Sequence, residues 1–321
     1  MSILVYIEQD QGKIKGSSLE AVSYAAGLSE LQGGEVNVLG LGSIAAEEWN
    51  KVGAAGANAI FHIGDERLDQ GVILAHANAI AQVFEKVEAS TLILAKSSLG
   101  DAVAARLAVK LEAGLVSNVV GLPDLSDGFV VKRSIFTGKA FADTSIDTEK
   151  KILAVKKNIH PIKTDGGEVK VESLDLTISE ENFVAKIIGA EKAEGEILLP
   201  EADIVVSGGR GLKGPENWNM IEELAESLNA AKGCSKPVSD LGWRPHHEHV
   251  GQTGVKVAPT LYVAVAISGA IQHLAGVNAS KYIVVINSDP DAPFFKAADY
   301  GIVGDAFDVV PKLTQAIKAL K

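Results

Sequence analysis

A glycine-rich run, GRGLKG at residues 209–214, has the spacing of a nucleotide-binding turn. It follows the apolar stretch ADIVVSG and precedes PENWNMIEELAESL, whose apolar residues recur at helical spacing. Glycines here let backbone amides approach a pyrophosphate, and the N-terminus of the following helix attracts its negative charge. Pro215 suits the first turn of that helix, while Arg210 and Lys213 add positive charge. The run favours nucleotide binding, but glycine turns also simply join strands to helices.

Two further runs place small and polar residues where a ligand could be held. VGQTG, at residues 250–254, sets an amide and a hydroxyl between two glycines. SGAIQH, at residues 268–273, follows the apolar run LYVAVAI and so lies at the carboxyl end of a strand, where open α/β sheets bind ligands. We expect Ser268 to cap the helix that follows. His273, taken alone, is interpreted as a surface histidine of that helix.

Asn287, Asp289 and Asp305 follow the last two predicted strands. Asn and Asp are common turn formers, so the turns alone explain all three. The same side chains also offer hydrogen-bond partners to a nucleotide, because the strand ends of a parallel sheet meet in one crevice. From the residues, both interpretations stay open.

Neither a metal site nor a redox thiol is predicted. His246, His247 and His249 share one loop, but the further Cys, His or carboxylate spacing of a closed zinc site does not accompany them. Cys234 is the single cysteine, so no internal disulfide forms. We interpret Cys234 as a small packed residue.

The elements that position these runs alternate between strands and helices. Short apolar runs bounded by Gly, Asp or Ser predict buried strands, and apolar residues three to four apart between them predict helices. This alternation predicts an α/β fold with parallel sheets and helices on their faces. Strands are predicted at residues 3–7, 36–41, 59–63, 91–95, 130–136, 152–156, 204–206, 261–267, 282–286 and 301–303.

The length of the chain and a Gly- and Pro-interrupted stretch near residues 189–200 predict two domains. Its 321 residues suffice for about two hydrophobic cores. A Glu- and Lys-rich stretch near residues 189–200, interrupted by Gly195 and Pro200, predicts a linker. We therefore expect an N-terminal domain at residues 1–192 and a C-terminal domain at residues 200–321.

Charge and hydropathy exclude several classes of protein. The formal net charge of −11 argues against a nucleic-acid partner, which would need a basic surface. The longest apolar stretch, residues 261–271, is too short to span a bilayer, and the N-terminus lacks the basic region of a signal peptide. We expect a cytoplasmic protein without direct membrane insertion, with a mature mitochondrial form as the alternative.

Five runs, in this order, carry a family resemblance: VVSGGRGLKGPEN, VGQTG, VAPTLYVAVAISGAIQHLAG, INSDPDAPFF and ADYGIVGDAFDVVP. The sequence resembles the alpha subunit of electron-transfer flavoproteins over nearly its whole length, most strongly from residue 204 onward. The resemblance implies a doubly wound, Rossmann-like C-terminal domain that binds FAD. It also implies an N-terminal parallel-sheet domain, similar to nucleotide hydrolases, that contacts a beta subunit in a heterodimer. In the family the beta subunit usually carries AMP, or a second FAD in the electron-bifurcating branch.

The resemblance implies FAD contacts at several strand ends and not only at the glycine run. It accounts for all the motifs, whereas a simple Rossmann interpretation accounts for the glycine run alone. It implies that Ser235 and Lys236 face the isoalloxazine ring, that Thr253 lies near N5 and that His273 lies near O2. Asn287 and Asp305 would contact the adenosine side. The implied cofactor-binding residues are Arg210, Ser235, Lys236, Val250, Gly251, Gln252, Thr253, Ser268, Gly269, Ala270, Ile271, Gln272, His273, Asn287 and Asp305.

The chain departs from the family at Lys236, where arginine is usual. Lysine keeps the charge but loses the planar fork and its stacking surface. A cation at ~4 Å from an anionic, one-electron-reduced ring contributes at most about 4 kcal/mol at an effective dielectric of about 20. We expect that anionic form to be retained but held less rigidly. The alternative is a solvated loop lysine.

The resemblance implies an electron carrier, and not an enzyme, with no catalytic residue of its own. Donors in the family are acyl-CoA dehydrogenases of fatty acid beta-oxidation and related flavin dehydrogenases, and the acceptor is a quinone oxidoreductase of the respiratory chain. Because the flavin edge must approach a partner, we expect the C-terminal domain to swivel on the linker. Alternatives are a subunit of a bifurcating complex that oxidises NADH, a dinucleotide-dependent dehydrogenase, and a scaffold that has lost its cofactor.

Overall fold

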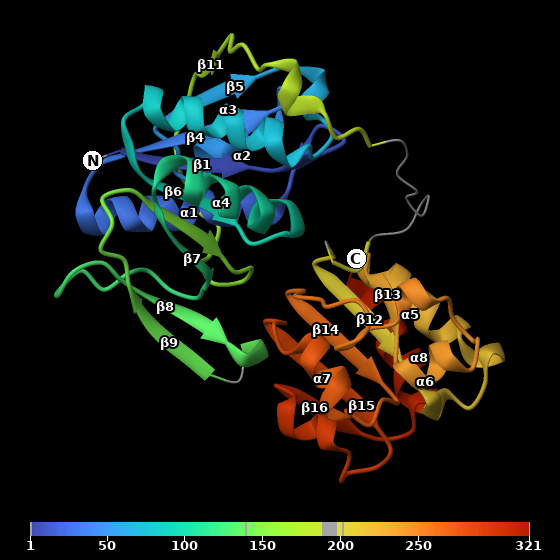
Figure 1. The fold of residues 1–321 in the computed structure, drawn as a ribbon. Helices are drawn as coiled ribbons and strands as arrows, with labels where there is room; N and C mark the ends of the chain where they lie inside the picture. The colour runs from blue at the N-terminus through green and yellow to red at the C-terminus, as the bar shows by residue number, and fades with distance from the viewer. Residues whose placement is uncertain (1, 139, 188–197, 201, 321) are drawn as a thin grey trace. The chain divides into compact units, whose positions relative to one another are not determined.

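The computed structural model describes residues 2–138, 140–187, 198–200 and 202–320 (Figure 1). The chain divides into an N-terminal unit, residues 1–190, and a C-terminal unit, residues 191–321. Each unit has its own sheet and its own buried apolar clusters, which confirms the predicted two-part α/β fold. The predicted linker at residues 189–200 and its swivel lie, apart from residues 198–200, outside the described residues.

A large, mostly parallel sheet forms the centre of the N-terminal unit. Its strands are β1 (Ser2–Ile7), β4 (Glu35–Leu41), β5 (Ala59–Ile63), β6 (Ala89–Ala95), β7 (Gly114–Val119), β8 (Val130–Ile135), β9 (Ala140–Ser145), β10 (Lys151–Val155) and β11 (Val171–Ser173). Within the described residues their order is β11-β5-β4-β1-β6-β10-β7-β8-β9. Strands β11 to β7 pair in parallel, and β8 and β9 add an antiparallel hairpin at one edge. A separate small hairpin joins β2 (Gln9–Asp10) to β3 (Lys13–Ile14).

Helices cover both faces of this sheet, since successive side chains of a strand point to opposite faces. These helices are α1 (Gly16–Gln32), α2 (Glu48–Ala54), α3 (Ile73–Lys86) and α4 (Ser98–Leu111), with 3₁₀ turns at Glu66–Leu68, Phe136–Gly138 and Glu180–Phe183. Leu4 and Tyr6 pack with α3 and α4, whereas Ile3, Val5 and Ile7 pack with α1 and α2. The apolar run predicted as a strand is therefore buried on both sides.

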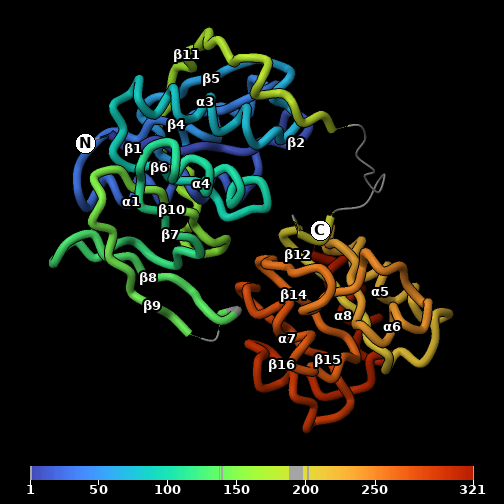
Figure 2. The backbone as a smooth tube through the Cα atoms, viewed as in Figure 1, coloured from blue at the N-terminus to red at the C-terminus, as the bar shows by residue number. Residues whose placement is uncertain are grey.

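The C-terminal unit has a smaller sheet that is parallel throughout its described strands. These are β12 (Ile204–Gly208), β13 (Ala231–Cys234), β14 (Leu261–Val265), β15 (Tyr282–Asn287) and β16 (Tyr300–Val303). Their order is β13-β12-β14-β15-β16, and Figure 2 traces β14 and β15 side by side. The chain leaves β12 toward β13 on one side and returns to β14 on the other. This reversal creates a topological switch point between β12 and β14, at which open α/β sheets bind ligands.

Helices flank both faces of the smaller sheet, as predicted for a doubly wound domain. They are α5 (Asn219–Leu228), α6 (Lys236–Asp240), α7 (Ile271–Val277) and α8 (Ala306–Leu320), with 3₁₀ turns at Arg210–Leu212, Pro215–Asn217, His246–Glu248 and Pro293–Ala297. Residues of α5, α6 and α8 pack on one face, and α7 with Phe294 packs on the other. Strand β14 ends at Val265, two residues before the predicted end, because Ala266 adopts a left-handed φ of 54°.

In the described part of the chain, the search for a helix both long enough and apolar enough to cross a bilayer finds none.

Candidate functional site

Two loops meet at the switch point of the C-terminal unit. The amide of Gly209 donates to the carbonyl of Val265 at 2.9 Å, and the amide of Gly211 donates to the carbonyl of Ala266 at 3.3 Å. A Cβ atom at Gly209 would lie 2.1 Å from the Ala266 oxygen, so a side chain there would separate the loops. Ala266 itself holds an uncommon positive φ, and such backbone strain tends to gather at functional sites.

The glycine run does not open directly into a helix, contrary to the sequence prediction. One 3₁₀ turn, Arg210–Leu212, lies within the run, a second, Pro215–Asn217, follows it, and α5 begins only at Asn219. Pro215 does occupy the first turn of the second 3₁₀ segment, and the Asn217 side chain closes it by donating to the Leu212 carbonyl at 2.9 Å. The Lys213 ammonium lies 5.1 Å from the ring centroid of Phe307. The N-terminus of α5 is therefore separated from the glycine run by the Pro215–Asn217 turn, and a pyrophosphate contact at the run stays a prediction.

A row of hydrogen bonds links the strand ends that carry the predicted site. The amide of Ser235, after β13, donates to the Gly208 carbonyl at the end of β12 at 3.0 Å. The Asn287 amide nitrogen, at the end of β15, donates to the Ile267 carbonyl after β14 at 3.0 Å. The structure therefore brings the predicted residues of β13, β12, β14 and β15 to one edge of the sheet.

The VGQTG loop joins this row by packing on α7. Its Val250 amide donates to the Cys234 carbonyl at 2.9 Å, and its Gln252 amide donates to the Gln272 carbonyl at 2.7 Å. A Cβ atom at Gly276 of α7 would lie 2.5 Å from the Cα of Gly251, so loop and helix are in direct contact. Residues 250–253 and 268–273 thus form one surface.

Burial divides the predicted site residues into a supporting set and an accessible set. Accessible polar groups can contact a ligand, whereas buried ones shape the backbone. Ile271 is notable because 68% of this apolar side chain is exposed. The buried residues are Ser235, Val250, Gly251, Gly269 and His273; Asn287 is half-buried; and Arg210, Lys236, Gln252, Thr253, Ser268, Ala270, Ile271, Gln272 and Asp305 are exposed.

Ser268 does not cap α7, contrary to the prediction. The helix begins two residues later than expected, and Ala270, which has no capping oxygen, occupies the N-cap. The Ser268 carbonyl instead accepts from the Phe294 amide at 3.0 Å. Gly269 has a φ of 82°, and a Cβ atom there would lie 2.5 Å from Phe294. The Phe294 segment therefore holds this loop open, with the Ser268 hydroxyl exposed.

Asn287 and Asp305 make the hydrogen bonds of turn formers. The Asn287 oxygen accepts from the Asp289 amide, and the Asp305 carboxylate accepts from the Phe307 amide, both at 3.0 Å. The turn interpretation therefore accounts for these contacts, and contact with an adenosine stays a prediction.

His273 lies in the interior, so the surface-helix interpretation of this residue is wrong. Its Nε2 lies 2.8 Å from the hydroxyl of Tyr262, and both side chains pack against the Phe294 ring. Burial, helped by the nearby His249, lowers the pKa of His273 to about 4. Its buried Nδ1 makes no hydrogen bond of ordinary geometry with any described residue. Sequence reasoning missed Tyr262, whose one signal is a hydroxyl in an otherwise aliphatic strand.

A cluster of side chains around Arg244 supports the loop that precedes Val250. Arg244 pairs with the buried carboxylate of Glu248 at 2.5 Å and with Glu222 at 3.3 Å, and its guanidinium lies over the Trp218 ring. Sequence reasoning missed this cluster, since Glu222 lies 22 residues from Arg244 in sequence. The interactions fix the start of the VGQTG loop.

The sequence predicts neither a metal at the histidine loop nor a redox role for Cys234, and both stay predictions. No group of three potential metal ligands occurs among the described residues. Cys234 is buried, and burial raises the pKa of its thiol to about 12, so the thiol stays protonated. Burial, then His246 and then Lys236 lower the pKa of His249, and His249 also pairs in an isolated bridge with Cys234, two residues before Lys236.

Comparison with known proteins fits this arrangement of strand ends. Residues 3–179 match the family model of the electron transfer flavoprotein domain, and residues 198–278 match that of the electron transfer flavoprotein FAD-binding domain. The chain is similar to the electron transfer flavoprotein subunit alpha of Thermoanaerobacterium thermosaccharolyticum, at 36% identity over 99% of this chain and 98% of that protein. The chain belongs to the electron-transfer flavoprotein alpha-subunit family. Similar subunits of Bacillus subtilis and Mycobacterium tuberculosis are 35% and 37% identical, over 99% of this chain and 98% and 99% of those proteins.

The cofactor of this electron-transfer flavoprotein alpha subunit is FAD, because its C-terminal unit matches the FAD-binding domain. The residues present fit such a group. The buried Nδ1 of His273 has no partner of ordinary geometry in the described chain, and exposed Gln252, Thr253 and Ser268 lie on the linked loops. The matched region ends at residue 278, so Asn287 and Asp305 lie beyond it.

Proposed function

We propose that this chain carries electrons as one half of a heterodimer with an electron-transfer flavoprotein beta subunit. The alpha subunit holds FAD along the carboxyl edge of the C-terminal sheet. FAD supplies the redox chemistry when bound, and the protein supplies orientation and electrostatics. The observation that carries this proposal is the buried Nδ1 of His273, which makes no hydrogen bond of ordinary geometry with the described residues and lies beside two loops that also belong to the predicted site.

The proposed contacts divide by the chemistry of each side chain. Gln252, Thr253 and Ser268 provide exposed neutral donors, and Ile271 provides an exposed apolar surface for a flat ring. Lys236, at the start of α6, provides a cation near the VGQTG loop. Arg210, Asn287 and Asp305 are the proposed contacts farther from the ring. The backbone of Val250, Gly251, Gly269 and Ala270 gives the loops their shape.

The proposed partners follow from family membership. Electrons enter from acyl-CoA dehydrogenases or related flavin dehydrogenases and leave to a quinone oxidoreductase of the respiratory chain. The beta subunit carries AMP in this proposal. The alternative is an electron-bifurcating complex that oxidises NADH, in which the beta subunit carries a second FAD.

The test is to purify the chain with its beta subunit, count flavins and record visible spectra during stepwise reduction. One FAD per heterodimer, reduced in two one-electron steps, supports the carrier. Two FAD per heterodimer with NADH oxidation supports the bifurcating alternative. A colourless complex that takes up no added FAD would overturn the flavoprotein function.

A further inference from the structure

Each unit contains a buried tyrosine whose hydroxyl meets a buried histidine. In the N-terminal unit, the Tyr6 hydroxyl lies 2.7 Å from Nδ1 of His76, and Nε2 of His76 lies 3.0 Å from the Leu68 carbonyl. A carbonyl only accepts, so Nε2 of His76 carries the proton. Burial lowers the pKa of His76, which keeps the ring neutral, and Nδ1 therefore accepts from the Tyr6 hydroxyl. Both nitrogens of His76 are satisfied.

The pair in the C-terminal unit lacks the second partner. The Tyr262 hydroxyl lies 2.8 Å from Nε2 of His273, and both residues are buried. The remaining nitrogen, Nδ1, makes no hydrogen bond of ordinary geometry with the described residues. The backbone of Val250 raises the pKa of His273, which is the direction that a carbonyl acceptor gives. Because this contact does not complete a hydrogen bond of ordinary geometry, unlike the one between His76 and Leu68, Nδ1 keeps its capacity to bond a ligand.

The protonation of Tyr262 supports the same direction of donation. Burial raises the pKa of Tyr262 far above its ordinary value, so the phenol keeps its proton. The Ser207 hydroxyl also lies near Tyr262, but it makes no hydrogen bond of ordinary geometry with the described residues. The phenol proton is then left for Nε2 of His273.

We propose that Tyr262 is a positioning residue, which donates to Nε2 of His273 and so holds the ring in the tautomer that is protonated at Nδ1. This inference rests on the proposed function, because it assigns that N–H to an acceptor atom of the bound cofactor. A fixed N–H donor selects a carbonyl-type oxygen or an unprotonated ring nitrogen, and it disfavours a donor group at the same place. Tyr262, a buried residue of β14, would therefore decide which cofactor atom can accept from the His273 N–H.

His76 and His273 differ in the partner that fixes the tautomer, so the Tyr6–His76 pair is a matched control for the Tyr262–His273 pair. The Leu68 carbonyl fixes His76 even without Tyr6, whereas Tyr262 is the side chain that meets Nε2 of His273. Tyr262→Phe should therefore free the tautomer of His273. Tyr6→Phe removes an equivalent hydroxyl from the other unit and should leave the tautomer of His76 unchanged.

The experiment is long-range ¹H–¹⁵N NMR of the ¹⁵N-histidine-labelled heterodimer, with His273→Gln and His76→Gln to assign the signals. We expect wild-type His273 to carry its proton at Nδ1 with about a tenfold excess over the other tautomer, the size of effect that one net hydrogen bond supplies. Tyr262→Phe should lose this excess. A wild-type proton at Nε2, or an unchanged excess in Tyr262→Phe, would overturn the inference. A wild-type proton at Nε2 overturns the inference even if Tyr262→Phe fails to fold.

Flavin absorbance of the same samples separates this inference from the proposed function. FAD bound with the His273 proton at Nε2 rejects the role of Tyr262 and leaves the flavoprotein function intact. No FAD uptake with the proton at Nδ1 rejects the cofactor acceptor, while the tautomer itself stands.

Discussion

At the scale of single residues, a buried imidazole is electrostatically different from an exposed ammonium. Burial keeps His273 uncharged at neutral pH, so in the proposed site it would orient a ligand through an N–H and add no positive charge. Lys236 is exposed, so dissolved salt screens the field of its ammonium group. The proposed site therefore combines a directional neutral donor with a weaker, screened cation, and the two are separable by mutation.

The stability of the C-terminal unit should fall as the pH is lowered from about 6.5 to about 4. In this window the unfolded chain binds a proton at His273 and the folded chain does not, so protonation favours unfolding. The folded pKa of about 4, against an ordinary value of 6.5, corresponds to about 3 kcal/mol at most. Denaturant melts at pH 7 and pH 4.5 measure the slope, which His273→Gln should reduce. An equal slope in this variant would show that other groups carry the dependence.

Lys236→Ala should lower the one-electron potential of the bound flavin by tens of millivolts, because the reduced ring loses a nearby cation. A tenfold change in the equilibrium constant is about 59 mV for one electron. Lys236→Arg keeps the charge and serves as the matched variant. Redox titration at two salt concentrations measures both. Unchanged potentials in Lys236→Ala would remove this residue from the site.

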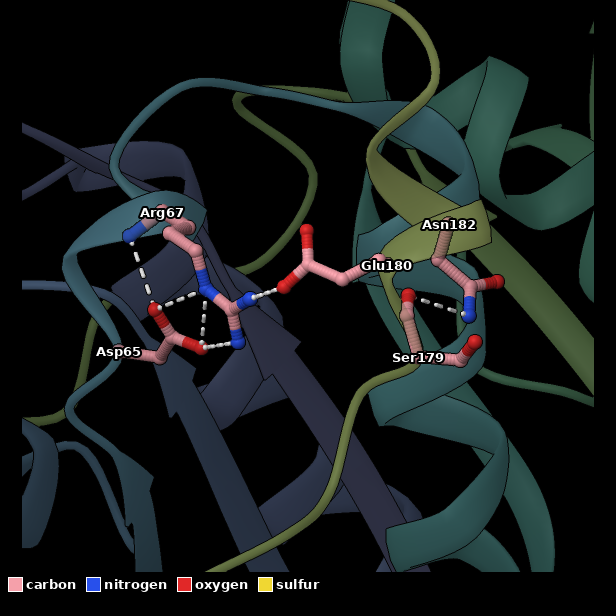
Figure 3. A network of polar contacts seen from close by, with 5 residues as sticks. All are labelled: Asp65, Arg67, Ser179, Glu180 and Asn182. Carbon is pink, nitrogen blue, oxygen red and sulfur yellow. Dashed lines mark hydrogen bonds and ion pairs between the residues drawn. The ribbon is translucent and has the colours of Figure 1, made fainter.

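At the scale of elements, Arg67 ties the last described segment of the N-terminal unit to the rest of that unit, alongside the apolar packing of Ile178 and Phe183. Figure 3 shows Arg67 between Asp65, which it meets at 2.6 Å, and Glu180 of a 3₁₀ turn, which it meets at 2.5 Å. The guanidinium also lies 4.4 Å from the ring centroid of Phe183. These contacts join segments 113 residues apart in sequence and fix where the chain leaves this unit.

Arg67→Lys should loosen this turn without unfolding the sheet. Lysine keeps the charge but loses the two-armed contact with Asp65 and the flat surface over Phe183. We expect faster hydrogen exchange in residues 180–183 and unchanged exchange in β1 and β6. Lys150→Ala removes a different surface ion pair, with Glu85, and serves as the control. Equal exchange of the turn in wild type and Arg67→Lys would mean that apolar packing alone holds it.

At the scale of the whole molecule, the separate cores of the two units should respond differently to the cofactor. A ligand stabilises only the folded unit that binds it, by about 2.7 kcal/mol at a concentration one hundred times its Kd. We expect scanning calorimetry to resolve a transition that rises with added FAD, assigned to the C-terminal unit, and another that does not. Equal shifts of all transitions would show that the units unfold together. Tyr6→Phe, in the N-terminal unit, should move only the FAD-insensitive transition.

The sequence by itself determined the alternation of strands and helices, because runs such as ILVYI and YIVVI are apolar at every position and suit strands buried on both faces. It also determined the family, since five motifs recur in order, and the loops that hold the proposed site. These features depend on neighbours in the chain, which a sequence displays directly.

Only the tertiary structure decided which side chains are buried and where helices begin. His273 looks like a surface residue on α7 until Tyr262 and Phe294, from two other segments, enclose it. Ser268 looks like a helix cap until the Phe294 amide takes its carbonyl and the helix starts later. Burial and capping depend on contacts between segments distant in sequence, and those contacts exist only after the sheet has set the order of its strands.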